Sequence, residues 1–410
     1  MTVSERVTCC VAGGGPAGAV VGLLLARAGV QTLVLEKHAD FLRDFRGDTI
    51  HPSTLALLDE LGLGEQLARL PLRHSETVSV VADDGEFTVA DFRRLPGQHV
   101  LAFLPQWDFL DMLLDEARAL PGFELRMRAE VTELLRRDDR VTGVSYRDAE
   151  GNEREVSAVL VIGTDGRDST VRTAADLRPR AYGAPMDVLW FRLSRHEQDP
   201  TNLLGRFSAG HLLVMIDRGE YWQVAYLVPK DGYGPLRRAG IETLRRSIAE
   251  LAPFLADRVD ELAGWDDVRL LRVQVDRLRR WSRSGVLCIG DAAHAMSPIG
   301  GVGINLAVQD AVAAARILAE PLRSGHLGRR HLARVQARRT VPTVLTQWGQ
   351  RAIQRRFLAP LLSGRNGGRA PVMMRLLDRH ERLRVIPAWL IGRGVLPEHA
   401  PRAPRLLTDP

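Results

Sequence analysis

The sequence is poor in cysteine and lysine, and it lacks a long uninterrupted apolar run. Its 410 residues include only 3 cysteines, Cys9, Cys10 and Cys288, which suggest no disulfide framework. A reducing cytoplasm therefore suits the chain best. No stretch approaches the roughly 20 uninterrupted apolar residues that span a bilayer, so we expect no membrane span. Glycines and Pro16 interrupt the apolar start of the chain, which argues against a signal peptide.

The chain is basic, but it contains no zinc-ligand spacing and no RNA-binding aromatic box. Its formal net charge is +6, and its basic residues are almost all arginines interspersed with acidic residues. We therefore expect neither a metal site nor a nucleic-acid partner. The positive charge favours anionic substrates or cofactors instead.

A glycine-rich turn near the N-terminus has the pattern of a dinucleotide-binding unit. The apolar run 7–12 predicts a strand that ends in a Gly-x-Gly-x-x-Gly turn, and small residues predict a helix over 19–28. A second predicted strand, 31–35, ends at Glu36. Glycines permit the turn and the approach of a pyrophosphate, and the acid about 20 positions on accepts ribose hydroxyls. The predicted contacts are Gly13, Gly15, Pro16, Ala17, Gly18, Glu36 and Lys37.

A second glycine-rich loop follows a buried strand late in the chain. The apolar run 286–289 delivers Asp291, and apolar residues recur at helical spacing over 307–319. In a parallel sheet, ligands bind at such a loop, although one such loop alone can be only a tight turn. The candidate contacts are Gly290, Asp291, Pro298, Gly300, Gly301, Gly303, Ile304 and Asn305.

A third loop follows the predicted buried strand 158–163 and contains Asp165, Gly166 and Arg172. An Asp-Gly pair by itself is an ordinary turn. At the end of a parallel strand, the same residues would lie at the sheet edge that carries Glu36. Both interpretations remain open at the level of sequence.

Two further loops precede predicted helices. Arg46 and His51 lie before a helix for which Ser53 is a plausible N-cap. Arg46 is either a solvated charge or a bidentate contact to a diphosphate, and His51 is either a structural or a catalytic residue. Gln106 lies just before another helix, whose cap Asp108 would suit.

The region 182–274 is predicted to form antiparallel strands, over 188–193, 211–216 and 221–228. Together with a predicted hairpin over 77–90, it would form a wall that faces the substrate. The candidate substrate contacts are His211, Gln223 and Tyr226. Gln223 and Tyr226 point to opposite faces of one strand, and the sequence does not show which face meets a ligand.

After the second glycine-rich loop, the chain is expected to be helical to near Leu362. Basic and apolar residues over 350–362 favour packing against the rest of the protein over a helix on a membrane surface. The Pro- and Arg-rich end from Pro397 is expected to fray.

With these three loops in this order, the sequence resembles the FAD-dependent aromatic hydroxylases, the p-hydroxybenzoate hydroxylase class of group A flavoprotein monooxygenases. Residues 13–18 with Glu36 match the ADP-binding fingerprint of that family, and residues 163–172 match its Asp-Gly motif. Residues 290–294 match its Gly-Asp motif, in which the aspartate holds the ribityl chain of FAD.

The resemblance covers about residues 5–320 and is weakest over 182–274. It places Arg46 and Gln106 at flavin contacts. It implies an α/β fold in which a Rossmann-like FAD-binding domain carries an inserted antiparallel-sheet substrate domain and a C-terminal helical segment. The expected FAD-binding domain is discontinuous and comprises 1–72, 98–181 and 275–320. The substrate sheet would comprise 73–97 and 182–274, and the helical region 321–410.

The implied activity is that of an FAD- and NAD(P)H-dependent monooxygenase. In such an enzyme NADPH or NADH acts as a transient electron donor, and a flavin C4a-hydroperoxide hydroxylates an aromatic or polycyclic small molecule with O2. Arg46, His51, Pro298 and Gly301 are then the catalytic candidates. The chain would be a monomer or a homodimer.

Three alternatives remain open: an FAD-dependent dehydrogenase or reductase of the same fold, a flavin-dependent halogenase, and a non-catalytic flavin-binding protein. The halogenase is disfavoured because the sequence lacks Trp-x-Trp-x-Ile-Pro.

Overall fold

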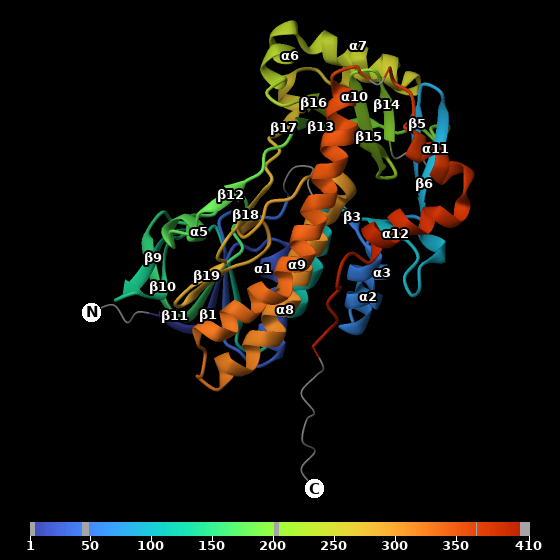
Figure 1. Cartoon of the computed structure of the whole chain (residues 1–410). Coiled ribbons are helices and arrows are strands. Elements are labelled where there is room, and N and C mark those ends of the chain that lie inside the picture. The colour runs from blue at the N-terminus through green and yellow to red at the C-terminus, as the bar shows by residue number, and fades with distance from the viewer. Residues whose placement is uncertain (1–4, 43–48, 201–204, 366, 402–410) are drawn as a thin grey trace.

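A parallel sheet brings the three predicted loops to one edge. The computed structural model describes residues 5–42, 49–200, 205–365 and 367–401 of the chain. Strands β8, β2, β1, β11 and β20 run parallel in that order, and β19, β10 and β9 extend the sheet antiparallel (Figure 1). The bounds are β1 (Glu5–Ala12), β2 (Thr32–Glu36), β8 (Phe123–Met127), β9 (Glu130–Arg137), β10 (Arg140–Arg147), β11 (Glu153–Gly163), β19 (Ser282–Arg283) and β20 (Val286–Cys288).

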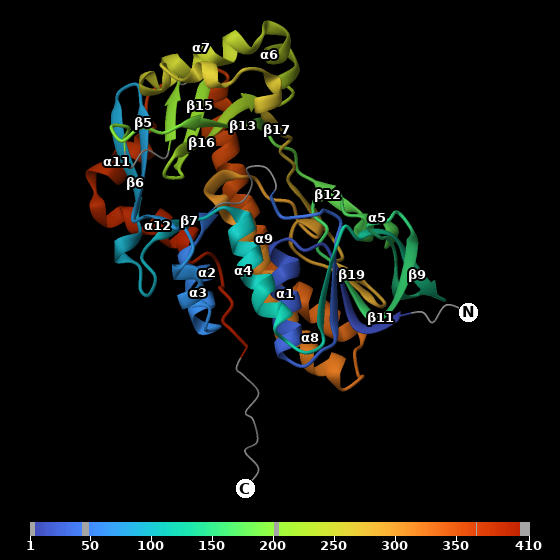
Figure 2. The ribbon, with the colours of Figure 1, turned by 180° about the vertical axis from the view of Figure 1, so that it is seen from behind.

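Three helices, α1 (Pro16–Arg27), α4 (Gln106–Arg118) and α8 (Val302–Arg323), lie together beside this sheet (Figure 2). Helix α1 is buried almost all round because it packs between the sheet, α4 and α8. A Cβ atom at Gly18 would lie 1.9 Å from the carbonyl oxygen of Gly13, so only glycine permits the close approach of the helix to the turn. Short helix α5 (Thr170–Ala174) contacts β9.

A seven-stranded sheet forms the upper part of the molecule in Figure 1. Its strand order is β17-β13-β16-β15-β14-β5-β6, so the predicted hairpin over 77–90 joins the predicted strands of the 182–274 region. The bounds are β5 (Thr77–Ala82), β6 (Gly85–Asp91), β13 (Met186–Ser194), β14 (Gly205–Ser208), β15 (His211–Asp217), β16 (Tyr221–Pro229) and β17 (Arg269–Leu271). Helices α6 (Tyr233–Ala239) and α7 (Ile241–Leu251) lie over its outer face.

Two small sheets and a helix pair connect these parts. The two-stranded sheet pairs β12 (Pro179–Ala181) with β18 (Asp276–Leu278). The three-stranded sheet contains β3 (Thr49–Ile50), β7 (Leu101–Phe103) and β4 (Arg73–Ser75). Helices α2 (Pro52–Glu60) and α3 (Gly64–Ala68) lie between β3 and β4 in the sequence.

The C-terminal part is helical, as predicted. Helix α9 (Arg329–Ile353) continues through a π-helical turn into α10 (Ala359–Leu362), and α11 (Val372–Arg379) and α12 (Val385–Gly392) follow. Gln350 and Gln354 are buried, and Leu361 packs against the seven-stranded sheet, so this segment packs within the protein. One helix of the described chain, Ile299–Arg323, is long and apolar enough to cross a membrane, but 72% of its most apolar window is buried inside the protein.

Two predicted helix caps are wrong. Helix α2 begins at Pro52 with His51 as its N-cap, and Ser53 lies inside the first turn. The ring of Pro52 fixes a helical φ and needs no N–H partner, which suits the first helical position. Helix α4 begins at Gln106, so Asp108 lies in its first turn, where its charge faces the positive end of the helix dipole.

The prediction of a frayed end from Pro397 is also wrong for the described residues up to 401. Glu398 is 3% exposed and accepts a hydrogen bond of 2.6 Å from Nε of Arg338. His399 and the N–H of Ala400 both bond to Glu60 on α2. Charged contacts to two helices thus hold a segment whose composition suggested disorder.

Candidate functional site

The N-terminal glycine turn leaves an open helix end. Gly13 has a φ of +104°, and a Cβ atom there would lie 2.7 Å from the carbonyl oxygen of Thr164. Gly15 is the N-cap of α1, and an added Cβ would meet nothing within 4 Å. No acidic residue lies in the first turn of α1, and no side chain caps it. The free N–H groups and the helix dipole therefore suit a diphosphate, so the turn fits the ADP half of FAD.

Glu36 lies at the end of β2 and is buried with 4% exposure. Its carboxylate accepts the N–H of Gly14 at 2.8 Å and the N–H of His38 at 3.0 Å. The carboxylate thus holds the glycine turn against the strand end where a ribose would lie. Lys37 is exposed beside it.

The aspartate of the Asp-Gly loop, Asp165, accepts hydrogen bonds from two residues that follow it in the chain. Asp165 accepts hydrogen bonds from Oγ of Ser169 at 2.5 Å and from the N–H of Val171 at 3.0 Å. Burial raises the pKa of Asp165, and these two bonds oppose the shift. Asp165 therefore organises the start of α5, and Gly166 continues the turn with a φ of +84°.

Arg167 connects the Asp-Gly loop to the Gly-Asp loop, and Arg172 contacts the backbone of Arg167. Arg167 donates from Nε to Asp291 at 3.1 Å, and Arg172 donates to the carbonyl oxygen of Arg167. Arg172 also lies 3.7 Å from Asp276 on β18. The structure therefore brings together two loops that are more than a hundred residues apart in sequence, as their positions at strand ends predict.

A buried network of charged residues, centred on Asp310 of α8, contacts the Gly-Asp turn. Asp310 on α8 accepts Nε of Arg339 at 2.9 Å and the N–H of Gly290 at 3.1 Å, and it lies 2.6 Å from Nε2 of His294. Burial alone would raise the pKa of Asp310, but the neighbouring His294 and Arg339 lower it overall. Gly290 has a φ of +59°, and an added Cβ would lie only 3.2 Å from that of Ala17, so a side chain there would be strained and tightly packed.

The loop from Pro298 leads into α8 through two left-handed glycines. Gly300 and Gly301 have φ values of +74° and +61°, and a Cβ at Gly301 would lie 2.9 Å from the Cβ of Thr49. Gly303, in the first turn of α8, has nothing within 4 Å of an added Cβ. The positive end of α8 is therefore open on the side of Gly303. Pro298 is half-buried, and Ile304 is buried.

Asn305 positions this loop through all of its amide atoms. Its Oδ1 accepts the N–H of His51 at 2.9 Å and Oγ1 of Thr54 at 2.7 Å. Its Nδ2 donates to the carbonyl oxygens of Thr49 and Gly301, at 3.2 Å each. Asn305 therefore ties α2 and β3 to the start of α8.

Of the remaining candidates near the flavin, the structure describes His51 and Gln106 but not Arg46. His51 is 1% exposed, and burial lowers its pKa to about 4, so its ring is neutral near pH 7. A neutral, buried N-cap residue favours the structural alternative for His51 over proton transfer. Gln106 is the half-buried first residue of α4. Arg46 lies outside the described residues.

The two faces of β16 have different surroundings. Trp222, Val224 and Tyr226 belong to the cluster beneath α7, and Tyr226 lies 2.6 Å from Nδ1 of His211. Gln223 belongs to the other, inner face, on the side where Ile299 of the Gly-Asp loop packs. His211 and Tyr226 therefore lie on the face that α7 covers, and Gln223 lies on the face toward the predicted flavin loop.

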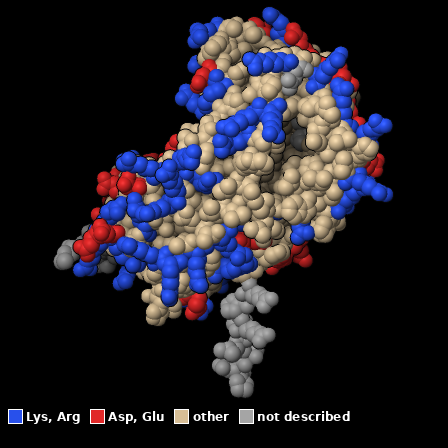
Figure 3. All heavy atoms as spheres, viewed as in Figure 1, with Lys and Arg blue, Asp and Glu red and all other residues tan. Residues whose placement is uncertain are grey.

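The inner face contains two buried hydrogen-bond donors, Nε1 of Trp190 and Nε2 of Gln223, that have no partner among the described residues. Trp190 packs near Ile216 and Phe103. Figure 3 shows a hollow in the surface near this sheet, beside the long C-terminal helices. Buried donors without partners are unusual in proteins and indicate where a polar ligand group would fit.

Sequence reasoning missed Arg167, Trp190 and Asp310. Arg167 lay inside the recognised Asp-Gly motif, so the motif itself contained its signal. Asp310 is a charged residue on the apolar side of a helix, which is a sign of a buried ionic partner. Trp190 had no comparable signal, because an aromatic residue in a strand usually packs in a core.

The chain is similar to known flavin-dependent proteins. A family model described as an FAD binding domain matches residues 6–348. The chain is 37% identical over 339 residues to a 6-methylpretetramide 4-monooxygenase of Streptomyces rimosus, covering 82% of this chain and 80% of that protein. It is 32% identical to a 12-dehydrotetracycline 5-monooxygenase/anhydrotetracycline 6-monooxygenase of Streptomyces rimosus subsp. rimosus, covering 75% of this chain but only 61% of that longer protein.

A solved structure shares the fold. The OxyS anhydrotetracycline hydroxylase from Streptomyces rimosus superposes with a TM-score of 0.73 and is 26% identical, covering 95% of this chain and 76% of that chain.

Proposed function

Because the chain belongs to the FAD-dependent aromatic hydroxylases, a family of flavoprotein monooxygenases, we propose that it hydroxylates a fused polycyclic aromatic molecule, with O2 as co-substrate and NADPH or NADH as the electron donor. The observation that carries this proposal is the meeting of three loops at one sheet edge, where Arg167 of the Asp-Gly loop pairs with Asp291 of the Gly-Asp loop.

The residues present fit FAD along the whole edge. The open N-terminus of α1 would take the diphosphate, Glu36 the ribose, and Asp291 the ribityl chain, while Gly300, Gly301 and Gly303 would approach the ring system. When bound, FAD would accept a hydride from the nucleotide and activate O2 for transfer of one oxygen atom to the substrate.

The chain itself would supply position, charge and exclusion of water. The positive end of α8 and the backbone N–H groups of its glycine-rich start would stabilise negative charge at the ring end of the site, as fixed dipoles do in oxyanion holes. His51, with its pKa lowered to about 4, would add no charge there at neutral pH. Asn305 would hold the loop in place through its four hydrogen bonds.

The inner face of the seven-stranded sheet would form the substrate wall. Ile216 and Val214 offer apolar surface, while Nε1 of Trp190 and Nε2 of Gln223 would donate hydrogen bonds to oxygen atoms of the substrate. The relatives named for 6-methylpretetramide and anhydrotetracycline support a polycyclic substrate class. An apolar surface with a few oriented donors suits a molecule of that class.

Three further assignments belong to the same proposal. The discontinuous division into an FAD-binding domain, a substrate sheet and a C-terminal helical region agrees with the separate parallel and antiparallel sheets. The cytoplasm remains the proposed compartment, since all 3 cysteines are free and buried. The proposed assembly is a monomer or a homodimer.

The test uses purified protein and its bound flavin. FAD should co-purify with the wild-type chain, and Asp291→Ala should lose much of it, while Asp139→Ala in the exposed β9–β10 turn should retain it. Addition of 6-methylpretetramide as a probe substrate should speed NADPH or NADH oxidation in air. Full flavin retention by Asp291→Ala would remove this residue from the site. Reduction of the flavin by the substrate itself, without nucleotide and without O2, would favour a dehydrogenase instead.

A further inference from the structure

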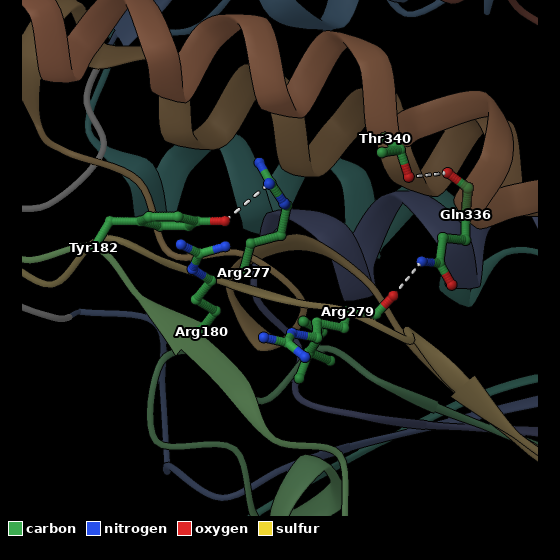
Figure 4. A pocket seen from close by; sticks show the side chains of 7 residues that line it. Arg180, Tyr182, Arg277, Arg279, Gln336 and Thr340 are labelled. Atoms are coloured by element: carbon green, nitrogen blue, oxygen red, sulfur yellow. Dashed lines mark hydrogen bonds between the residues drawn. The ribbon is translucent and has the colours of Figure 1, made fainter.

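A basic pocket lies between the two-stranded sheet β12–β18 and helix α9, apart from the three loops (Figure 4). Its volume is about 250 Å³, and it is lined mainly by Arg180, Tyr182, Arg277, Arg279, Gln336 and Thr340. Arginines line the lower side in Figure 4, while Gln336 and Thr340 come from the helix above. None of these residues belongs to the proposed flavin site.

The pocket carries positive charge that is not balanced by nearby acids. Among the described residues, no carboxylate lies within 4.0 Å of the guanidinium groups of Arg180, Arg277 or Arg279. Asp276, next to Arg277 in β18, points to the other face of the strand, where it pairs with Arg172. Figure 3 shows basic side chains gathered over this part of the molecule. Three guanidinium groups without a nearby carboxylate favour the binding of an anion.

Arg277 is held in place by hydrogen bonds, and the ring of Tyr182 lies close to Arg180 and Arg277. Arg277 donates from Nη1 to Oε1 of Gln347 at 3.0 Å and from Nη2 to the hydroxyl of Tyr182 at 2.8 Å. The guanidinium carbons of Arg180, Arg277 and Arg351 lie 5.5, 5.4 and 4.6 Å from the centre of the Tyr182 ring. The ring therefore gathers several cations through cation–π contacts. A guanidinium group held in this way loses less conformational freedom when it binds a phosphate oxygen.

The size of the pocket limits what it can hold. Pockets for whole organic ligands usually measure about 300–1,000 Å³. A cavity of about 250 Å³ suits a phosphate or diphosphate group better than a fused polycyclic ring system or a complete dinucleotide. The ligand would thus place its phosphate end here and extend beyond the pocket.

One side chain joins this pocket to the Gly-Asp loop. Gln347, which accepts the bond from Arg277, donates from Nε2 to the carbonyl oxygens of Asp276 at 2.7 Å and Ala295 at 3.1 Å. Ala295 lies between Asp291 and Pro298 in that loop. We infer that the pocket binds phosphate groups of the nicotinamide nucleotide that donates electrons, an inference that rests on the proposed function.

The experiment compares the double variant Arg180→Gln/Arg279→Gln with Arg280→Gln. All three arginines are exposed, and Arg280 does not line the pocket, so Arg280→Gln measures the effect of losing one nearby positive charge outside the pocket. Inorganic pyrophosphate is titrated into the FAD-loaded proteins by calorimetry. Each lost guanidinium should weaken binding about tenfold, since a charge-assisted hydrogen bond contributes on that scale. The half-saturating nucleotide concentration should rise by a similar factor, with kcat and the flavin spectrum unchanged.

Two results would overturn the inference. Equal pyrophosphate affinity in the double variant and in Arg280→Gln would remove the site, even if no aromatic substrate supports turnover. Weaker pyrophosphate binding with an unchanged half-saturating nucleotide concentration would show a phosphate site that does not serve the electron donor. The calorimetric measurement needs no turnover, so failure of the proposed reaction and failure of the pocket are distinguishable.

Discussion

Replacement of Asp310 by asparagine should destabilise the protein strongly, because the change leaves a buried cation with a weaker partner. Asp310 and Arg339 are at most 1% exposed, and among the described residues the variant would retain only Glu398, at 3.7 Å, as a carboxylate near Arg339. Breaking a buried ion pair by removing one partner costs about 3–5 kcal/mol. Glu398 should keep the loss near the lower end, at about 3 kcal/mol.

Urea titration followed by tryptophan fluorescence, at neutral pH, measures this loss of unfolding free energy. The control is Asp115→Asn, which removes an ion pair with Arg118 whose side chains are both about half exposed or more, and it should change little. The pKa of Asp310 lies below its ordinary value, so its contribution is present above about pH 4 and is lost as the pH falls further. Similar losses in both variants would refute the assignment of stability to the buried pair.

The other predictions concern the loop at α8, the buried histidine and the substrate wall. Gly301→Ala should lower the unfolding free energy by about 1–2 kcal/mol, because Gly301 has a left-handed φ and a Cβ there would contact Thr49. Gly303→Ala should leave the unfolding free energy unchanged but weaken FAD binding. Equal losses of unfolding free energy in the two variants would contradict the loop geometry. The folded pKa of His51, about 4, lies below its unfolded value of 6.5, so the unfolding free energy of the wild type should fall by about 3 kcal/mol as the pH falls from 6.5 to 4. A His51→Gln variant whose unfolding free energy shows the same pH slope in urea titrations would refute this. Trp190→Phe should raise the half-saturating substrate concentration about five- to tenfold without affecting that of the nucleotide, and an unchanged value would place Nε1 outside the substrate site.

The predicted fold class and family are confirmed, because the signals that carried them are local. Each of the three loops follows an apolar strand end, and Gly13 and Gly290 adopt the positive φ angles of their turns because glycine has no side chain. Parallel strands then bring their carboxyl ends to one edge without further information from the sequence. The cap at Ser53 was predicted wrongly because Pro52 already occupies the first helical position of α2. The cap at Asp108 was predicted wrongly because α4 begins two residues earlier, at Gln106, with Pro105 as its N-cap.

The substrate side could not be oriented from the sequence. Both faces of β16 are buried: one carries Trp222, Val224 and Tyr226, and the other carries Gln223, Ala225 and Leu227. The alternation of side chains therefore does not show which face is directed toward a ligand. Only the packing of α7 on one face and of Ile299 on the other separates them. The network of His294, Asp310 and Arg339 likewise depends on tertiary contacts between residues 16 and 29 positions apart.

The most direct test of the central claim is mass spectrometry of the product formed from a polycyclic aromatic substrate under isotopically labelled oxygen gas. With FAD bound and NADPH or NADH supplied, one oxygen atom of the gas should enter each product molecule, and a variant that cannot retain FAD should form no product. A product that contains no labelled oxygen, or equal turnover by protein without flavin, would contradict the assignment of this site to a flavoprotein monooxygenase.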